Sequence, residues 1–294
     1  MKVIILLITL LITSCGSHKI KSSLQSKNDA FSEESFMRFG NSRLNEISDK
    51  DFLNKSLSMC YNGNFKGSLQ DLQSNINDYR KNQKYWLYIG ICYQLYGNNL
   101  KANYFYDYAF SGNNLIQASI LNNKSLMALK ASNYEDAHTL LEKAIKLSPS
   151  SKVPKYNLAQ LYIKFNHLKK ARNLIQPLIL KNSNDIDLLL SMMTIEIAEG
   201  NLEKANSWAK RFKTEHLRRE DISLYVALLY YELKRYEEAK SVIGGQRATI
   251  IEEINSATKV LTKKIDIELE RIKEESDSKD AKVKKGVKRV AVKN

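Results

Sequence analysis

The sequence predicts an all-α fold built from about six repeated helix pairs. A small residue recurs with spacings of 34, 35, 34, 34 and 34, each time after a short polar turn, at Ser68, Ala102, Ala137, Ala171, Ala205 and Ala239. Apolar residues between these positions follow the i, i+3, i+4 spacing of amphipathic helices. The 294 residues include only 11 Gly and 3 Pro, which disfavours turn-rich β structure and Gly-looped nucleotide folds.

The first element is an export signal over residues 1–14. Its apolar run, residues 3–12, is too short to span a bilayer of about 30 Å and suits a signal peptide. The run ends in Ile12-Thr13-Ser14-Cys15, which resembles the lipobox of bacterial lipoproteins. That resemblance implies removal of residues 1–14 and acylation of Cys15, with palmitate among the acyl chains. The alternative is an ordinary signal peptide with a chance cysteine.

Residues 15–48 form the second element, a polar, Ser- and Lys-rich tether that we expect to be flexible. Gly16 and Ser17 follow the cysteine, so the Asp that retains such lipoproteins in the inner membrane is missing. The resemblance therefore implies an outer-membrane lipoprotein that faces the periplasm. Export also argues against nucleic acid as the partner behind the net charge of +14.

Residues 49–246 contain the six repeats. The second repeat carries the fullest pattern, with Trp86, Ile89, Gly90, Tyr93, Ala102, Tyr106 and Ala109 at fixed offsets. This pattern resembles the tetratricopeptide repeat, although Glu196 stands where that family usually has Tyr. Because one helix pair cannot bury its apolar face alone, the repeats must stack. The resemblance implies a right-handed superhelical solenoid.

Two further elements follow the pair Gly244-Gly245, which interrupts the helical pattern. Residues 247–275 resume an apolar stripe backed by Glu and Lys, as expected of a helix that caps a solenoid. Residues 276–294 carry seven Lys/Arg and two Asp without a core-forming pattern, so we expect a disordered basic tail. It is either simply solvated or an electrostatic arm for anionic envelope polymers or lipid head groups.

The sequence predicts no enzyme, no cofactor and no metal site. It lacks the phosphate-binding patterns GxGxxG and GxxxxGK[ST], the nucleophile elbow GxSxG, and the metal patterns HExxH and CxxC. The four histidines, His18, His138, His167 and His216, are isolated from one another in the sequence. An enzyme with an unrecognised site is the alternative.

Cys60 and Cys92 lie in the first helices of neighbouring repeats. First helices of adjacent repeats pack side by side, and an exported protein meets oxidising conditions, so a disulfide is conceivable. Two buried thiols that act as small apolar side chains are the alternative that the pattern favours.

The candidate partner-binding site is the concave groove that the tetratricopeptide resemblance implies. Its first-helix positions carry mostly apolar residues with a few polar ones: Leu53, Leu57, Leu87, Ile91, Gln94, Leu95, Asn122, Leu126, Leu129, Tyr156, Gln160, Ile163, Leu190, Ile197, Leu224, Leu228 and Tyr231. Part of this set must be core. The composition suits an amphipathic helix or an extended apolar segment of a partner, and lacks the Lys/Asn clamp of chaperone-binding members.

An aromatic excess marks residues 85–110, which contain ten Phe, Tyr or Trp residues. Trp86, Tyr93 and Tyr106 fall on packing positions of the repeat. The remainder exceeds what one helix pair needs inside, which predicts a surface for protein or glycan contact. A merely aromatic core is an equal alternative.

Together these features predict a lipid-anchored scaffold for protein partners. The chain resembles the repeat lipoproteins that assist pilus or secretion systems of the Flp/Tad and type IV kinds, including pilotins that escort a secretin. The implied partner is a secretin or pilus component. The alternative is a regulator that binds and activates a peptidoglycan synthase, with that cell-wall synthase as the partner.

Overall fold

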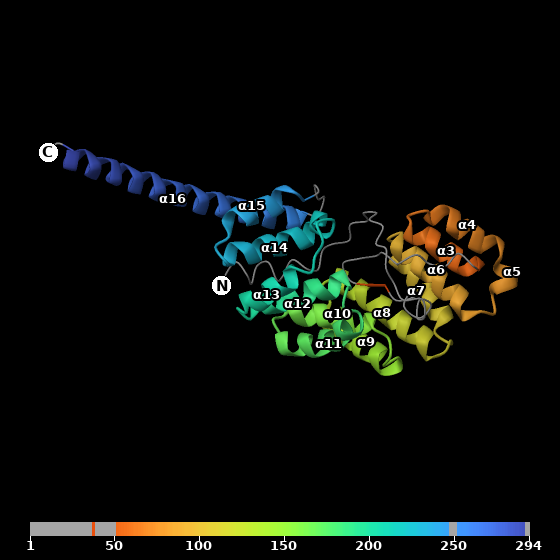
Figure 1. Cartoon of the computed structure of the whole chain (residues 1–294). Coiled ribbons are helices and arrows are strands. Elements are labelled where there is room, and N and C mark those ends of the chain that lie inside the picture. The colour runs from red at the N-terminus through yellow and green to blue at the C-terminus, as the bar shows by residue number, and fades with distance from the viewer. Residues whose placement is uncertain (1–36, 39–50, 247–251, 292–294) are drawn as a thin grey trace. The chain divides into compact units, whose positions relative to one another are not determined.

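The computed structural model describes residues 37–38, 51–246 and 252–291, with residues 280–291 as backbone only. Within these ranges the regular structure is entirely helical, and successive helices are joined by short turns (Figure 1). Cys15, the signal segment and most of the tether lie outside the described residues. The chain divides into two compact units, one up to Ser183 and one from Asn184.

Six helix pairs correspond to the six predicted repeats, so the predicted fold class is confirmed. In the first unit the pairs are α3 Phe52–Tyr61 with α4 Phe65–Ser74, α6 Gln83–Leu95 with α7 Asn99–Ala109, α8 Asn114–Lys130 with α9 Tyr134–Leu147, and α10 Val153–Lys164 with α11 Leu168–Lys181. In the second unit they are α12 Ile186–Ala198 with α13 Leu202–Ala209, and α14 Glu220–Glu232 with α15 Tyr236–Gly244. Two short helices stand between pairs, α5 Ile76–Tyr79 and the 3-10 helix η2 His216–Arg218.

Each pair turns at one residue with positive φ. Gly63, Gly97 and Gly200 hold this position at φ of 83°, 88° and 77°, and Ser132, Asn166 and Lys234 hold it in the other pairs at 58–59°. The amide N–H of the next residue reaches back five residues to a carbonyl of the first helix, as from Asn98 to Tyr93 (2.8 Å). This bond closes a Schellman motif, which ends the first helix and leaves Asn98 as the N-cap of the second.

The recurring small residues hold the paired helices close together. Ser68, Ala102, Ala137, Ala171, Ala205 and Ala239 are all fully buried. In the second pair Gly90 allows an even closer approach, since a Cβ on it would lie 2.5 Å from the Tyr106 ring. The 34-residue period therefore records the contact between the two helices of each pair.

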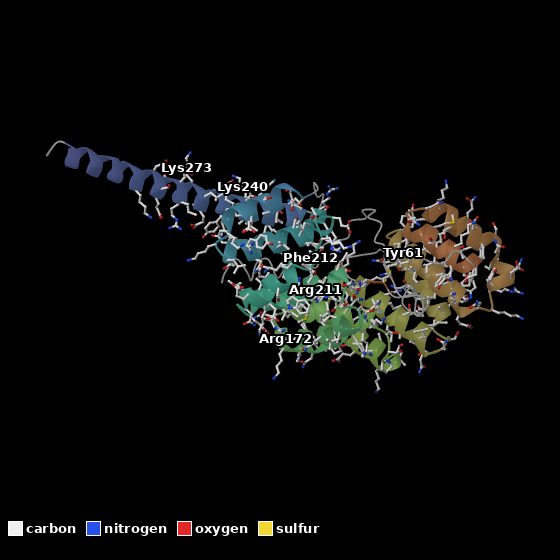
Figure 2. All side chains as sticks on the ribbon, in the orientation of Figure 1. Tyr61, Arg172, Arg211, Phe212, Lys240 and Lys273 are labelled. Atoms are coloured by element: carbon white, nitrogen blue, oxygen red, sulfur yellow. A yellow bond between two sulfur atoms is a disulfide. The ribbon has the colours of Figure 1, made fainter. Side chains whose placement is uncertain are left out.

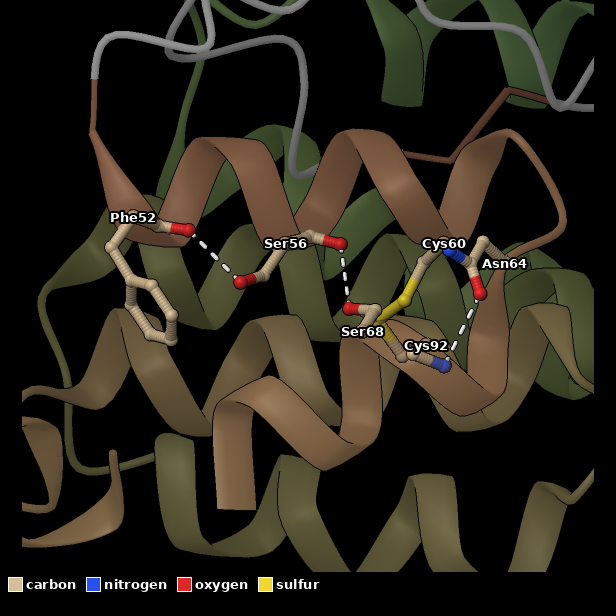
Figure 3. The surroundings of a disulfide bond; sticks show 7 residues. Phe52, Ser56, Cys60, Asn64, Ser68 and Cys92 are labelled. Atoms are coloured by element: carbon tan, nitrogen blue, oxygen red, sulfur yellow. Dashed lines mark hydrogen bonds between the residues drawn. A yellow bond between two sulfur atoms is a disulfide. The ribbon is translucent and has the colours of Figure 1, made fainter. Parts of the chain in front are cut away.

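A disulfide joins the first two pairs. Cys60 of α3 and Cys92 of α6 are bonded, with their Cα atoms 5.3 Å apart (Figure 3). Beside the bond, the Ser68 hydroxyl donates to the Ser56 carbonyl (2.7 Å), and the Ser56 hydroxyl donates to the Phe52 carbonyl (2.9 Å). The favoured expectation of two free thiols is wrong, because α3 and α6 pack side by side and bring the cysteines within bonding reach.

The second unit buries two carboxylates on α12, Asp187 and Glu196. Arg219 donates to Asp187 (2.7 Å) and to Asp221 (2.7 Å), so α14 is tied to α12. Burial alone would lower the pKa of Arg219, but the two carboxylates raise it above its ordinary value. Glu196, the departure from the repeat pattern, is buried on α12 and accepts a hydrogen bond from the Asn201 side chain (3.0 Å).

The last helix, α16 Glu252–Ala291, covers the sixth pair. Ile254, Leu261 and Ile265 are buried, and Lys240 of α15, labelled in Figure 2, donates to Asp266 (2.8 Å). The helix continues through residues 276–291, where the sequence predicts disorder. Before that stretch, at residues 268–275, the exposed part of the helix is supported locally, because Arg271 pairs with Glu268 (2.8 Å) and Glu275 (3.4 Å) about one turn away. Among the described helices, none is long and apolar enough to cross a bilayer.

Candidate partner-binding site

The predicted groove residues are mostly buried. In the first unit Leu87, Ile91, Asn122, Leu129, Tyr156, Gln160 and Ile163 are buried, and Gln94 and Leu126 are half-buried. In the second unit Leu190, Ile197, Leu224 and Leu228 are buried, and Tyr231 is half-buried. The apolar members therefore pack between helices and offer little open surface here. That these residues line a partner-binding surface stays a prediction.

Two of the predicted polar positions have clear partners. The Gln94 side chain donates to the backbone carbonyl of Asn123 (2.9 Å) and accepts from the Tyr106 hydroxyl (2.6 Å). Burial raises the pKa of Tyr106 well above its ordinary value, so this hydroxyl keeps its proton. Gln94 thus connects α6 and α7 to α8. Asn122 instead contacts a residue outside the repeats.

Asn122 helps to hold a segment from outside the repeats. Its side-chain amide donates to the backbone carbonyl of Met37 (2.9 Å), and so does the amide of Asn157 (3.0 Å). The Met37 backbone N–H donates to the side-chain oxygen of Asn123 (2.8 Å). We call Asn122, Asn123 and Asn157 the asparagine cradle. It satisfies both main-chain groups of one residue that precedes the repeats by many positions in sequence.

The cradle is closed and internally bonded. All three asparagines are fully buried. Asn157 donates to the Asn122 side-chain oxygen (2.8 Å) and Asn122 donates to that of Asn123 (3.0 Å), which links helix α8 to helix α10. These bonds fix which end of each amide faces Met37, because an amide offers donors at one end and an acceptor at the other.

Side chains of the bound segment contact the same region. Met37 is buried in the apolar cluster of the first unit, which includes Ile91 and Ile120, with Leu126 packed against it. The Arg38 guanidinium lies over the Tyr156 ring, 4.4 Å from its centre, a cation–π geometry. Of the predicted groove residues, Tyr156 therefore contacts the bound segment, and Leu126 lies one turn after Asn122 and Asn123 on α8.

Asn123, Asn157, Met37 and Arg38 were not among the predicted site residues. A signal for the cradle exists in the sequence, because one polar or Tyr residue stands at the same place in every first helix. The series is Asn54, Tyr88, Asn122, Asn157, Ser191 and Tyr225, with spacings of 34, 34, 35, 34 and 34. Nothing in the sequence indicates that Met37 would meet it.

The aromatic excess of residues 85–110 divides between core and surface. Tyr85, Tyr88 and Tyr106 are fully buried, whereas Tyr104 and Tyr108 are 58% and 54% exposed. Phe105 stacks between Trp86 (5.9 Å between ring centres) and Tyr93 (5.4 Å), and Tyr104 and Tyr108 adjoin this stack. Part of the set is therefore core and part is exposed; contact of the exposed part with a protein or glycan stays a prediction.

The described ranges contain no cluster of potential metal ligands. Among those residues, no three His, Cys, Asp or Glu side chains lie together as metal ligands would. His138 contacts the Tyr162 hydroxyl (3.0 Å) on the neighbouring pair. His216 accepts a hydrogen bond at Nδ1 from the Lys213 backbone N–H (3.1 Å).

Comparison with known proteins agrees with the helical-repeat fold. Residues 128–195 match the tetratricopeptide repeat family. No curated protein matches the chain in sequence. Among solved structures, the chain is similar to PilW, a widely conserved type IV pilus biogenesis factor, at 15% identity and a TM-score of 0.53, over 68% of this chain and 92% of that one.

Two further structures have the same fold. PilF of Pseudomonas aeruginosa is 18% identical, with a TM-score of 0.54 over 65% of this chain and 87% of that one. A tetratricopeptide repeat protein of Parabacteroides merdae is 18% identical, with a TM-score of 0.53 over 74% of this chain and 84% of that one. At these identities the likeness establishes the fold alone, a helical-repeat solenoid of the tetratricopeptide kind.

Proposed function

We propose that this protein is a lipid-anchored scaffold that binds a polypeptide segment of a partner in the bacterial envelope. The observation that carries the proposal is the asparagine cradle, which holds the main chain of Met37 with three hydrogen bonds. A helix face that binds one non-helical segment in this way has the chemistry to bind another. No catalytic activity is part of the proposal.

The proposed location is the outer membrane, with the repeats in the periplasm. The lipobox-like sequence that ends at Cys15 supports an acyl anchor, and several acyl chains give stable attachment. The bond between Cys60 and Cys92 supports export, since disulfides persist in oxidising compartments. Metabolic labelling with palmitate tests the anchor. We expect label in the unmodified chain and none in Cys15→Ser; equal labelling would refute it.

For the partner, we propose a component of a pilus or secretion machine, such as a secretin, with a pilotin-like role for this protein. The support is the shared fold with PilW, together with the lipoprotein signal. A peptidoglycan synthase that this protein activates is the alternative partner.

The deciding experiment is crosslinking and affinity purification from the native envelope, followed by mass spectrometry. Leu126→Glu places a charge one turn from the asparagine cradle on α8, and Leu180→Glu is the matched control because Leu180 is 78% exposed on α11. We expect a secretin or pilus component that is recovered with the control and lost with Leu126→Glu. Recovery of a cell-wall synthase with the same loss would assign the regulator role instead. Identical recovery from both variants would refute this site.

A further inference from the structure

The asparagine cradle recognises the main chain of the residue that it binds. Its amides meet both the N–H and the carbonyl of Met37, groups that every residue except proline presents. Full burial of the three asparagines makes these bonds necessary, because a buried amide without partners is strongly destabilising. Met37 is 85 residues or more from each of them, so the site is satisfied by a segment that the repeats do not themselves contain.

We propose that Met37–Arg38 occupies a partner's binding site as an internal competitor, and that a partner's segment of the same chemistry replaces it. This inference rests on the proposed function and names the ligand of the same site. The ligand is a non-helical segment with an unbranched apolar residue followed by a basic one. The apolar side chain enters the cluster that includes Ile91 and Ile120, and the cation stacks on Tyr156.

An internal competitor sets the apparent affinity of the site. Tethering gives the bound segment an effective concentration of about millimolar for a short linker. Only molecules whose cradle is vacant bind a partner, so the apparent dissociation constant rises by the inverse of the vacant fraction. A weak or dilute partner would be rejected, whereas a concentrated or multivalent one would displace Met37–Arg38.

The test measures binding of a labelled peptide of residues 31–43, FSEESFMRFGNSR, by fluorescence anisotropy to the full chain in detergent. The opened chain carries Met37→Pro, which removes the N–H that donates to Asn123, and Arg38→Glu, which removes the cation over Tyr156. We expect the opened chain to bind the peptide at least about tenfold more tightly than the unmodified chain. Equal affinity of the two chains would overturn the proposal.

Two controls keep the result independent of folding defects. The same peptide with an N-methylated methionine amide leaves the protein unchanged, and we expect the opened chain to bind it at least about tenfold more weakly. Equal binding of both peptides would show that the site does not recognise the main-chain N–H of the methionine. Asn157→Leu in the opened chain removes a donor to the Met37 carbonyl, and we expect weaker binding of the unmodified peptide.

The outcomes separate this inference from the proposed function. If the opened chain fails to bind the peptide while an envelope partner is still captured in a Leu126-dependent way, the internal competitor is wrong and the scaffold role stands. If the peptide binds as expected and no partner is captured from the envelope, the cradle is a peptide site and the proposed role is wrong.

Discussion

Reduction of the bond between Cys60 and Cys92 should destabilise the first unit by an amount that its loop length sets. The cysteines are 32 residues apart. A crosslink that closes a loop of this size removes unfolded-state entropy worth about 3.7 kcal/mol at 25 °C in the chain-entropy model. Reduction is a cleaner change than substitution, because both sulfur atoms stay in the core and no cavity forms.

The assay follows urea unfolding of the oxidised and the reduced chain by tryptophan fluorescence. The protein has two tryptophans, so Trp208→Phe leaves Trp86, which lies in α6, the helix of the first unit that carries Cys92, as the sole reporter. Cys15→Ser removes the third cysteine, so the reductant acts on this one bond. An unchanged unfolding midpoint after reduction, or two free thiols in the denatured unreduced chain, would refute the reasoning.

Three further predictions concern the packing, the turns and a half-buried histidine. Gly90→Ala should destabilise the first unit by up to about 2 kcal/mol, because a clash of about 1–3 kcal/mol with Tyr106 outweighs about 1 kcal/mol of gained helix propensity; a urea midpoint equal to that of the unmodified chain would contradict this. Gly244→Ala in the second unit, whose Cβ meets nothing within 4 Å, should not destabilise that unit. Lys234→Gly should stabilise the second unit by about 1 kcal/mol, since φ is 59° there, as measured by urea unfolding of a Trp86→Phe chain in which Trp208 of α13 is the reporter; a loss of stability would show that the lysine side chain does more than occupy the turn. Burial lowers the pKa of His216 below its ordinary 6.5. Its contribution to the free energy of unfolding is therefore present above about pH 6.5 and is lost as the pH falls below that value. The urea midpoint should fall between about pH 7.5 and about pH 5 because of this loss, and His216→Gln should lack it.

The repeated part of the fold was predictable because its contacts are local and periodic. The positive-φ turn, the small residue that follows it and the paired helices all recur at the 34-residue period, so the sequence records them directly. The length of α16 was not predictable in the same way. Beyond Ile265 the described side chains of α16 are mostly exposed, and charge pairs of Arg271 with Glu268 and Glu275 support the helix locally up to residue 275, before the predicted tail begins.

The site was only partly predictable, for a physical reason. The tetratricopeptide pattern places Asn122, Leu126 and Tyr156 on the first helices; Asn122 and Tyr156 contact the bound segment, and Leu126 lies one turn further along α8. The pattern does not distinguish residues that pack between helices from those that face a ligand, so Leu190 and Leu224 were also included and are buried. The contact of Met37 with the cradle joins residues 85–120 positions apart, and no local signal reports such a contact.

The most direct test of the scaffold account is photo-crosslinking in the envelope of intact cells. A diazirine side chain replaces Leu126, which lies one turn after Asn122 and Asn123 on α8, and in a matched strain it replaces Leu180, which is exposed on α11. The account predicts a covalent adduct with a second protein from position 126, stronger in the chain that carries Met37→Pro and Arg38→Glu, and absent from position 180. The same adducts from both positions, or none with a second protein from position 126, would contradict it.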